Sequence, residues 1–397
     1  MAKKLLTVLI VLFLANTAIA QNLQIKGVVK DLITNEVIGQ VSITTQDQKY
    51  GTVSNDEGAF SLSSPESSKA ITLTHLNYTT LSVDANKLPA DGIFLMEPQQ
   101  LMLDEIVIMG EPIQDVLNKL ITTSMARFTA PLLLSTYYRE FVKINDNYTK
   151  FADALIDYNA RRKGKKLDTE VVVKQSRAAK LPGEDEENID IVSPLDVRKA
   201  VEKDYNFAGI HNVLLDKKEY KKYDFLVKVQ QGKEGQKTHS IIVQPKDDVQ
   251  EALFEGTITY DPEQFLILNV DLSMAESHKK YIKERNFLII KASLEDMEYK
   301  SAFKIVDDKY LLSFSSRNGT VHIRNKRTYN DNITFKSDLI VTNFTSDLSS
   351  FNKKERYKDK ALYDHGSNYT ENFWLKNNSL LLTKEEERII KSIENKQ

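Results

Sequence analysis

The sequence has 397 residues, no cysteine and a formal net charge of −2, from 54 basic and 56 acidic residues. The absence of cysteine excludes a disulfide framework, thiol catalysis, zinc–thiolate sites and a lipid anchor on an N-terminal cysteine. The slightly acidic balance argues against nucleic acid as a partner, because such a partner would favour a basic face. The length is sufficient for two domains held together by burial alone.

Residues 1–20 have the layout of a secretory signal peptide. Lys3 and Lys4 precede an apolar run from Leu5 to Leu14, and Ala18-Ile19-Ala20 fits a signal-peptidase site. The alternative, an N-terminal membrane anchor, would need about 20 apolar residues. We therefore expect cleavage after Ala20 and an exported protein, periplasmic or associated with the outer membrane. Cleavage would leave 52 basic against 56 acidic residues, and no transmembrane segment is expected beyond it.

Residues 22–98 show short strands separated by turns. The segments 24–30 and 59–63 alternate polar and apolar positions, with Phe60 and Leu62 on one face. Further strands are expected at 41–44, 50–53, 70–76 and 93–96, separated by turns rich in Asn, Asp and Gly. Short strands at this spacing are typical of a small antiparallel β-sandwich.

Motifs in this region resemble the carboxypeptidase-regulatory-like domain. They are Gly27, Val37-Ile38-Gly39, Val41-Ser42-Ile43, Gly51–Leu62, His75–Tyr78, Phe94–Glu97 and Leu103–Gly110. The last motif resembles the segment that usually follows this domain in outer-membrane receptors of TonB-dependent systems and related envelope proteins. Gln40, Asn55 and Asn77 depart from the residues usual at their positions. The resemblance implies a seven-stranded, transthyretin-like sandwich of the carbohydrate-binding-like type, with no catalytic residues of its own.

Residues 99–134 are expected to link two domains. Pro112 suits the first turn of a helix that ends near Arg127. Apolar residues then recur at three- and four-residue steps and predict a packing helix. These residues are Ile113, Val116, Leu117, Leu120 and Ile121.

Residues 135–397 are expected to form an antiparallel β-rich domain. Two hairpins are predicted, one turning at Asn145-Asp146-Asn147 and one at Asp261-Pro262-Glu263. Further strands are expected at 170–175, 287–292, 299–305, 310–315, 320–324 and 333–344, which together make a large curved sheet. Short helices are expected from Pro194 to Asp204, capped by Ser193, and after Thr383. The predicted class is mainly β, with few short helices.

This half resembles the uncharacterised β-rich domain that often follows the regulatory-like module in envelope proteins. The resemblance rests on Tyr138-Arg139-Glu140, on the hairpin 256–270 and on Phe373-Trp374. The hairpin is also similar, in topology alone, to the half-open barrels of periplasmic lipoprotein carriers.

The sequence offers no constellation that carries chemistry. No histidine pair has metal-ligand spacing, no histidine sits beside a Gly-flanked serine, and no Gly-rich phosphate loop occurs. We therefore expect a chain that is not an enzyme, with no catalytic, metal or cofactor-binding residues and no cofactor. A hydrolase would need histidines and carboxylates converging in one cleft. The six histidines are His75, His211, His239, His278, His322 and His365.

Two charged runs are interpreted as solvated loops. The acidic run Glu184–Glu187 lacks the alternating spacing and turn glycine of a calcium loop. The basic stretch Arg161–Lys166 is expected at a hairpin tip, with phosphate or lipopolysaccharide contact as its alternative.

Two functions stay open at this point. The first is an interaction or scaffolding role, with another envelope protein as the partner. The alternative is a periplasmic carrier or binding protein that holds an apolar or glycan ligand on the curved sheet. The carrier predicts a contiguous concave face of Phe, Leu and Ile, and ligand in the purified protein.

Overall fold

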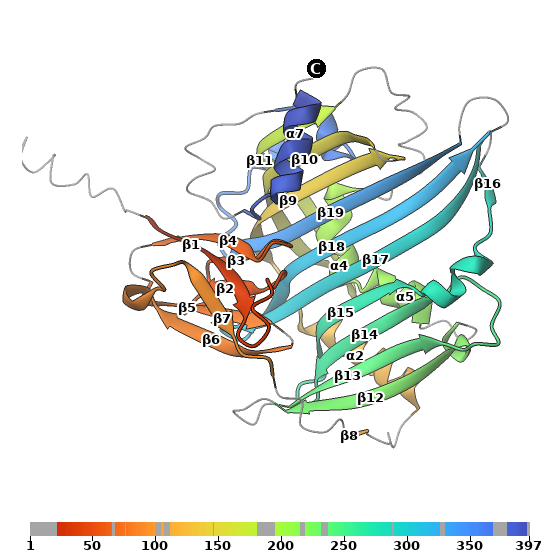
Figure 1. The fold of residues 1–397 in the computed structure, drawn as a ribbon, viewed down its shortest axis with the longest axis horizontal. Coiled ribbons are helices and arrows are strands. Elements are labelled where there is room, and N and C mark those ends of the chain that lie inside the picture. Colours follow the sequence, from red (N-terminus) through yellow and green to blue (C-terminus); the bar gives the residue numbers. More distant parts are fainter. Residues whose placement is uncertain are drawn as a thin grey trace, which may run out of the picture.

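The computed structural model describes residues 22–65, 68–75, 77–99, 105–106, 112–145, 147–180, 195–214, 219–231, 237–287, 290–325, 330–367 and 379–394. It has a small N-terminal sandwich beside a large curved sheet (Figure 1). The fold is mainly β with few short helices, as the sequence predicts.

The N-terminal part is a sandwich of seven strands. One sheet has the order β4 (Ala59–Pro65), β1 (Asn22–Asp31), β7 (Ile93–Met96). The other has the order β3 (Gly51–Val53), β2 (Ser42–Thr45), β5 (Ala70–His75), β6 (Tyr78–Asp84). Strand β6 is the one member that sequence patterning does not find, and β1 pairs with β7 in parallel, whereas antiparallel pairing is expected.

The core of the sandwich comes from the inward positions of both sheets. Phe60 and Leu62 are fully buried on one face of β4, as predicted, and the Phe60 ring meets Phe94 edge-on at 5.2 Å between centroids. Asn55 keeps the β3–β4 turn, because its Oδ1 accepts hydrogen bonds from the backbone N–H groups of Glu57 at 3.0 Å and Ala59 at 2.9 Å.

Twelve strands form the large sheet. Its order is β11-β10-β9-β19-β18-β17-β15-β14-β13-β12-β8, with β16 paired to β17. Every pairing in it is antiparallel. The strands are β8 (Glu105–Ile106), β9 (Leu132–Ile144), β10 (Asn147–Lys163), β11 (Lys166–Lys180), β12 (Tyr223–Gln231), β13 (Lys237–Pro245), β14 (Phe254–Asp261), β15 (Leu266–Met274), β16 (Arg285–Phe287), β17 (Ile290–Val306), β18 (Lys309–Arg324) and β19 (Asn330–Thr345).

The strands of this sheet are longer than the sequence pattern predicts. The expected strands 299–305 and 310–315 are parts of β17 and β18, of 17 and 16 residues. Irregularities in the β17–β18 pairing fall at Leu294/Asp296 and Ala302/Phe303. Such bulges shift the alternation of side chains without ending the pairing, so a pattern of strict alternation divides one strand into two.

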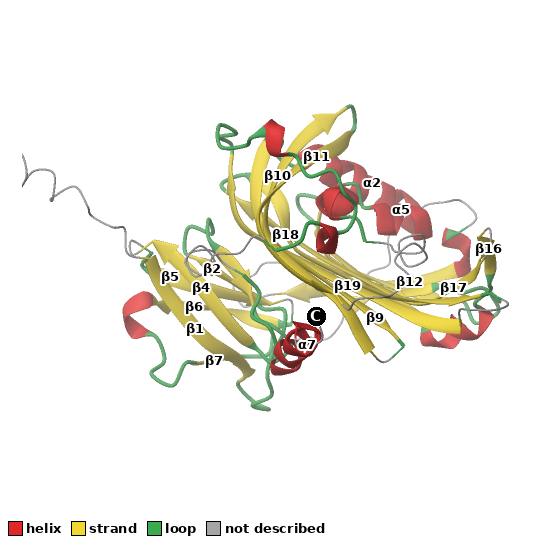
Figure 2. Cartoon of the chain, turned by 90° about the horizontal axis from the view of Figure 1, so that it is seen from above, coloured by secondary structure: helices red, strands yellow, loops and turns green. Residues whose placement is uncertain are grey.

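Helices cover the concave face of the sheet (Figure 2). The α-helices there are α2 (Ile113–Arg127), α4 (Ala200–Tyr205) and α5 (Ala208–Leu214). The prediction of α2 is confirmed at both ends. The helix expected from Pro194 begins instead as the 3-10 helix η2 (Val197–Lys199), capped by Asp196, and Ser193 lies outside the described residues. The other 3-10 helices are η1 (Ala85–Lys87), η3 (Tyr220–Lys222), η4 (Glu276–Tyr281), η5 (Lys353–Glu355) and η6 (Leu362–Asp364).

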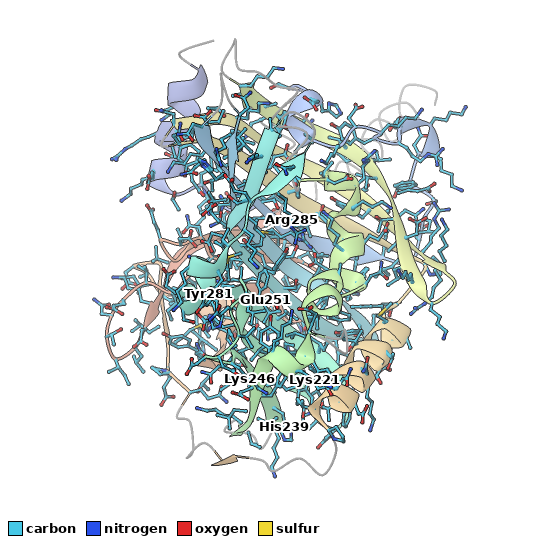
Figure 3. All side chains as sticks on the ribbon, turned by 90° about the vertical axis from the view of Figure 1, so that its right-hand side faces the viewer. Lys221, His239, Lys246, Glu251, Tyr281 and Arg285 are labelled. Carbon is cyan, nitrogen blue, oxygen red and sulfur yellow. The ribbon has the colours of Figure 1, made fainter. Side chains whose placement is uncertain are left out.

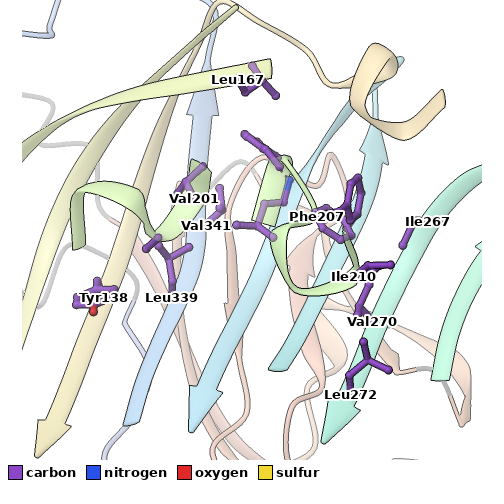
Figure 4. Close-up of a cluster of buried hydrophobic side chains, with 14 of the residues drawn as sticks. Tyr138, Leu167, Val201, Phe207, Ile210, Ile267, Val270, Leu272, Leu339 and Val341 are labelled. Carbon is purple, nitrogen blue, oxygen red and sulfur yellow. Dashed lines mark hydrogen bonds between the residues drawn. The ribbon is translucent and has the colours of Figure 1, made fainter. Parts of the chain in front are cut away.

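The helices fill the concave face with the chain's own apolar side chains. From α2, Leu120 and Ile121 are buried against the sheet, and the Phe128 ring stacks on Tyr310 at 4.5 Å. Figure 4 shows Val201, Phe207 and Ile210 facing residues of the sheet. The inner strands are therefore covered by protein.

The sandwich and helix α7 (Lys384–Glu394) lie on the opposite, convex side (Figure 2). Val53 of the sandwich packs with Tyr137, Phe314 and Ile340 of the sheet. The Asn55 amide donates to the Leu381 carbonyl at 3.3 Å, at the approach to α7. Thr383 caps α7 as predicted: its Oγ1 accepts from the Glu386 N–H at 3.2 Å, and the Glu386 carboxylate accepts from the Thr383 N–H at 2.8 Å.

Candidate functional site

The histidines singled out from the sequence lie on separate elements. His239 in β13 has Nδ1 3.1 Å from the Tyr260 hydroxyl, and burial lowers its pKa. His322 in β18 has Nδ1 2.8 Å from Asn332 Oδ1, and the His365 ring stacks on Tyr357. The structure brings no three His, Asp or Glu side chains of the described residues into a group that could hold a metal ion.

Two further histidines make hydrogen bonds within the chain. His278 is buried in η4 between the Ser277 hydroxyl and the Lys246 carbonyl. His75 ends β5 and accepts a hydrogen bond at Nδ1 from the Asn77 N–H at 3.2 Å. The side chain of His211, on α5, is outside the described residues.

The basic stretch 161–166 lies at the β10–β11 hairpin tip, as expected, where Gly164 has φ +63°. The Arg162 guanidinium donates to the carbonyls of Met125, Ala126 and Phe128 at 2.6–2.8 Å and so caps the C-terminus of α2. Arg161 forms an ion pair with Glu170. Both arginines are thus engaged within the chain. The acidic run 184–187 lies outside the described residues.

Exposed apolar side chains gather on the outer face of the sandwich. Of the five exposed large hydrophobic residues in the described chain, four belong to this part, and Ile33 is 77% exposed. Lys30 pairs with Leu95 on one side and forms a bridge with Val37 on the other, so these side chains lie in one row next to the 32–33 turn. We call this set the outer patch; its members are Leu32, Ile33, Val37 and Leu95.

A tight turn holds the apolar tip of the outer patch in solvent. Asp31 Oδ1 accepts hydrogen bonds from the N–H groups of Ile33 at 2.7 Å and Thr34 at 2.8 Å, and Asn35 takes φ +61°. Asp31 Oδ2 accepts from the Tyr78 hydroxyl at 2.9 Å. These hydrogen bonds, that of Thr34 first, lower the pKa of Asp31. The turn therefore fixes Ile33 in place without burying it.

The outer patch faces away from the large sheet. The other sheet of the sandwich is the one that approaches the large sheet, because Ser42, Thr44 and Thr72 line a cleft together with Asn269 and Lys300 of β15 and β17. The outer patch is on β1, β7 and the loops beside them. It is consequently open to a partner while the sandwich stays docked.

A second candidate surface is a hollow of about 850 Å³ near the outer end of the large sheet, which we call the end hollow. Its rim carries Glu251, Tyr281 and Arg285, which Figure 3 shows on the same side of the molecule. Leu294, the fifth exposed large hydrophobic residue, is 40% exposed there. The apolar lining consists of Ala252, Phe254, Met274, Ile282, Ala292, Leu294 and Val321.

Residues 25–108 match the family model of the CarboxypepD_reg-like domain. This part of the chain is a CarboxypepD_reg-like domain. The match agrees with the resemblance found in the sequence and with the seven-stranded sandwich. The outer patch thus belongs to the regulatory-like domain.

Comparison with other proteins adds little for the large sheet. No curated protein matches the chain. A solved structure of lipovitellin, titled for its lipid–protein interactions, is 11% identical, with a TM-score of 0.22 over 65% of this chain and 29% of that chain. The chain thus spans less than a third of the length of that protein. Among the described residues, no helix has the length and apolar character needed to cross a membrane.

Sequence reasoning did not identify the outer patch. The segment 31–36 is one of the turns between the predicted strands; turns are usually polar, and this one carries Leu32 and Ile33 side by side. Two large apolar residues inside a turn are the signal that could have found it.

Proposed function

We propose that the chain is an exported, non-catalytic protein of the bacterial cell envelope that binds another envelope protein through its regulatory-like domain. The observation that carries this proposal is the outer patch. Single exposed apolar residues are common on protein surfaces, but a cluster of them marks interaction sites. A partner that covered Ile33 and Leu95 would remove apolar surface from water, which favours association.

The rest of the chain supports a scaffolding role. The regulatory-like domain is fixed to the large sheet by the apolar contacts of Val53. Hydrogen bonds from Thr52 to the Ser379 carbonyl and from Asn55 to the Leu381 carbonyl fix it to the segment before α7. A domain held in this way presents its outer patch in one orientation. The sheet that carries this domain is in turn packed against helices on its concave face.

The non-catalytic and exported character is part of the proposal. The described histidines have structural partners on separate elements, which supports a role without catalysis. The signal-like residues 1–20 and the absence of cysteine fit an exported chain. N-terminal sequencing of the purified protein is expected to begin at Gln21, and an intact Met1 in the cytosol would contradict export.

Site-specific photo-crosslinking in intact cells tests the interaction. A photoreactive side chain is placed at position 33, at position 95 or, as a matched exposed site on the large sheet, at position 294. We expect one discrete protein adduct from positions 33 and 95 and none from 294. Adducts of equal yield from all three positions, or none from 33 and 95, would overturn the proposal.

The end hollow favours a second candidate function, a binding protein for an amphipathic ligand. Its apolar lining, with Leu294 exposed, could receive a hydrocarbon chain, and Lys283 and Arg285 at its rim could receive an acidic head. Most of the concave face is filled by α2, α4 and α5, so this ligand would occupy one end of the sheet. Native mass spectrometry of the full chain tests it: a bound mass lost in Leu294→Asp supports it, and bare protein counts against it.

A further inference from the structure

A smaller pocket lies between helix α5 and strands β15, β17 and β18, apart from both surfaces described above. We call it the inner pocket; its volume is about 220 Å³. Figure 4 shows Phe207 and Ile210 on the helical side facing Val270 and Leu272 on the sheet. For comparison, an apolar cavity of about 150 Å³ binds benzene. The inner pocket therefore has room for a small organic molecule.

One end of the inner pocket is polar and contains a buried ion pair. The Arg317 Nη2 donates to Asp204 Oδ1 at 2.7 Å, and the Ser301 hydroxyl donates to the same oxygen at 2.7 Å. The Asp204 side chain is only 6% exposed. Its other oxygen, Oδ2, is buried and has no hydrogen-bond partner among the described residues.

An unpartnered buried carboxylate oxygen is costly, because it has left water without replacing the hydrogen bonds it made there. Asp204 lines the inner pocket, so a rotation of its carboxylate would bring this buried oxygen to a donor on a bound molecule. A hydroxyl group is a donor of suitable size. The unpaired oxygen thus indicates where a ligand hydroxyl belongs.

The charges that line the inner pocket favour an anion. Lys203 and Arg317 are cationic, and Asp204 is the one carboxylate among the lining residues. A guanidinium is well suited to hold a carboxylate or phosphate. Lys203, Tyr299 and Arg317 are all partly exposed, so this charged end is also the one that solvent reaches.

We propose that the inner pocket binds a small amphipathic anion that carries a hydroxyl group close to its acid group. The hydroxyl donates to Asp204 Oδ2, the acid group accepts from Arg317, and the hydrocarbon part lies among Phe207, Ile210 and Leu272. This site is independent of the outer patch and of the partner that the patch binds.

Calorimetric titration of the full chain tests the assignment, with 3-hydroxyoctanoate, octanoate and 1-octanol as probes. We expect 3-hydroxyoctanoate to bind roughly tenfold or more tightly than octanoate, from one hydrogen bond to a charged group. We expect 1-octanol, which lacks the acid group, to bind more weakly than either acid. Equal binding of the two acids overturns the proposal. A folded chain that binds neither acid also overturns it, because water alone would then occupy the site at Asp204.

Two variants separate the roles of the residues. In Asp204→Asn the preference for the hydroxylated acid is expected to fall to about one, whereas Asp157→Asn, a buried carboxylate of β10 paired with Lys174, should keep it. Gly209→Leu should abolish binding of both acids, since a Cβ at this position would face the Tyr299 ring at 3.8 Å. If Asp204→Asn fails to fold, Gly209→Leu still tests whether the acids bind in the inner pocket. Undiminished binding in Gly209→Leu would contradict the site.

Discussion

The guanidinium of Arg139 donates from Nη1 to the carboxylate of Glu386 at 2.8 Å, which joins strand β9 to helix α7 across 247 residues of sequence. Nε of Arg139 donates to Asp338 at 2.7 Å, and the three side chains are largely buried. Lys336 lies 3.6 Å from Glu386 and 3.7 Å from Asp56 of the regulatory-like domain. This cluster connects the sheet, the last helix and the domain.

Glu386→Ala should therefore destabilise the protein. It removes one carboxylate from a buried ion pair and the reciprocal cap with Thr383, for a combined loss of roughly 2–4 kcal/mol in the free energy of unfolding. Urea unfolding measures this loss. Glu387→Ala, an exposed neighbour on the same helix, should change stability by less than about 0.5 kcal/mol. Equal effects of the two changes would show that the cluster contributes nothing.

Glu140 should make stability depend on pH. Burial raises the pKa of this carboxyl group to about 7 from its ordinary 4.5, although it accepts hydrogen bonds from the N–H groups of Leu362 and Tyr363. Because the folded state binds the proton more tightly than the unfolded chain, the stability linked to this group is fully present below pH 4.5. It is lost as the pH rises through about 7.

Glu140→Gln removes that titration and keeps an oxygen that can accept both N–H bonds. Relative to the wild type, the variant should gain roughly 1–3 kcal/mol in free energy of unfolding between pH 5 and pH 8. Urea unfolding at four pH values measures the difference, with Glu385→Gln, which is exposed, as the control. A difference that stays constant with pH would contradict the prediction.

Gly256 should tolerate no side chain. Its φ is +144°, and a Cβ there would lie 2.0 Å from the Asp271 carbonyl oxygen across the β14–β15 hairpin. Gly256→Ala should cost at least about 2 kcal/mol. Gly164→Ala, at φ +63° with no atom within 4 Å of its Cβ, should cost about 1 kcal/mol. Thermal unfolding of both variants tests the comparison, and a smaller loss in Gly256→Ala would refute it.

The outer patch should be dispensable for folding. Ile33→Asp and Leu95→Asp alter exposed side chains, so each should change the free energy of unfolding by less than about 0.5 kcal/mol. With the photoreactive side chain placed at position 37 of the outer patch, the double variant should nevertheless lose the adduct formed in cells, and Leu294→Asp should keep it. A double variant that is already unfolded in the unfolding measurement would show instead that the outer patch has a structural role.

Local chemistry explains which elements the sequence could predict. The helix from Ile113 to Arg127 follows from apolar residues at helical spacing. The hairpin turns follow from their own side chains: Asn145 takes φ +52°, and Asp261 Oδ1 accepts from the N–H groups of Glu263 and Gln264. The sequence pattern divides each of β17 and β18 into two shorter strands, because pairing with neighbouring strands extends them through irregular positions such as Leu294.

The candidate sites depend on contacts that a linear pattern does not contain. Asp204 and Arg317 are 113 positions apart and meet only because α4 packs on β18. The outer patch needs β1 and β7 to pair in parallel before Lys30 and Leu95 become neighbours. Neither site leaves a motif in the sequence, and both follow from tertiary structure.

Hydrogen–deuterium exchange of the full chain, with and without its crosslinking partner, tests the outer patch most directly. The account predicts that the partner slows exchange in residues 28–37 and 93–97 and leaves β16 and β17 unchanged. Protection confined to β16 and β17, with residues 28–37 exchanging as fast as in the free chain, would contradict it.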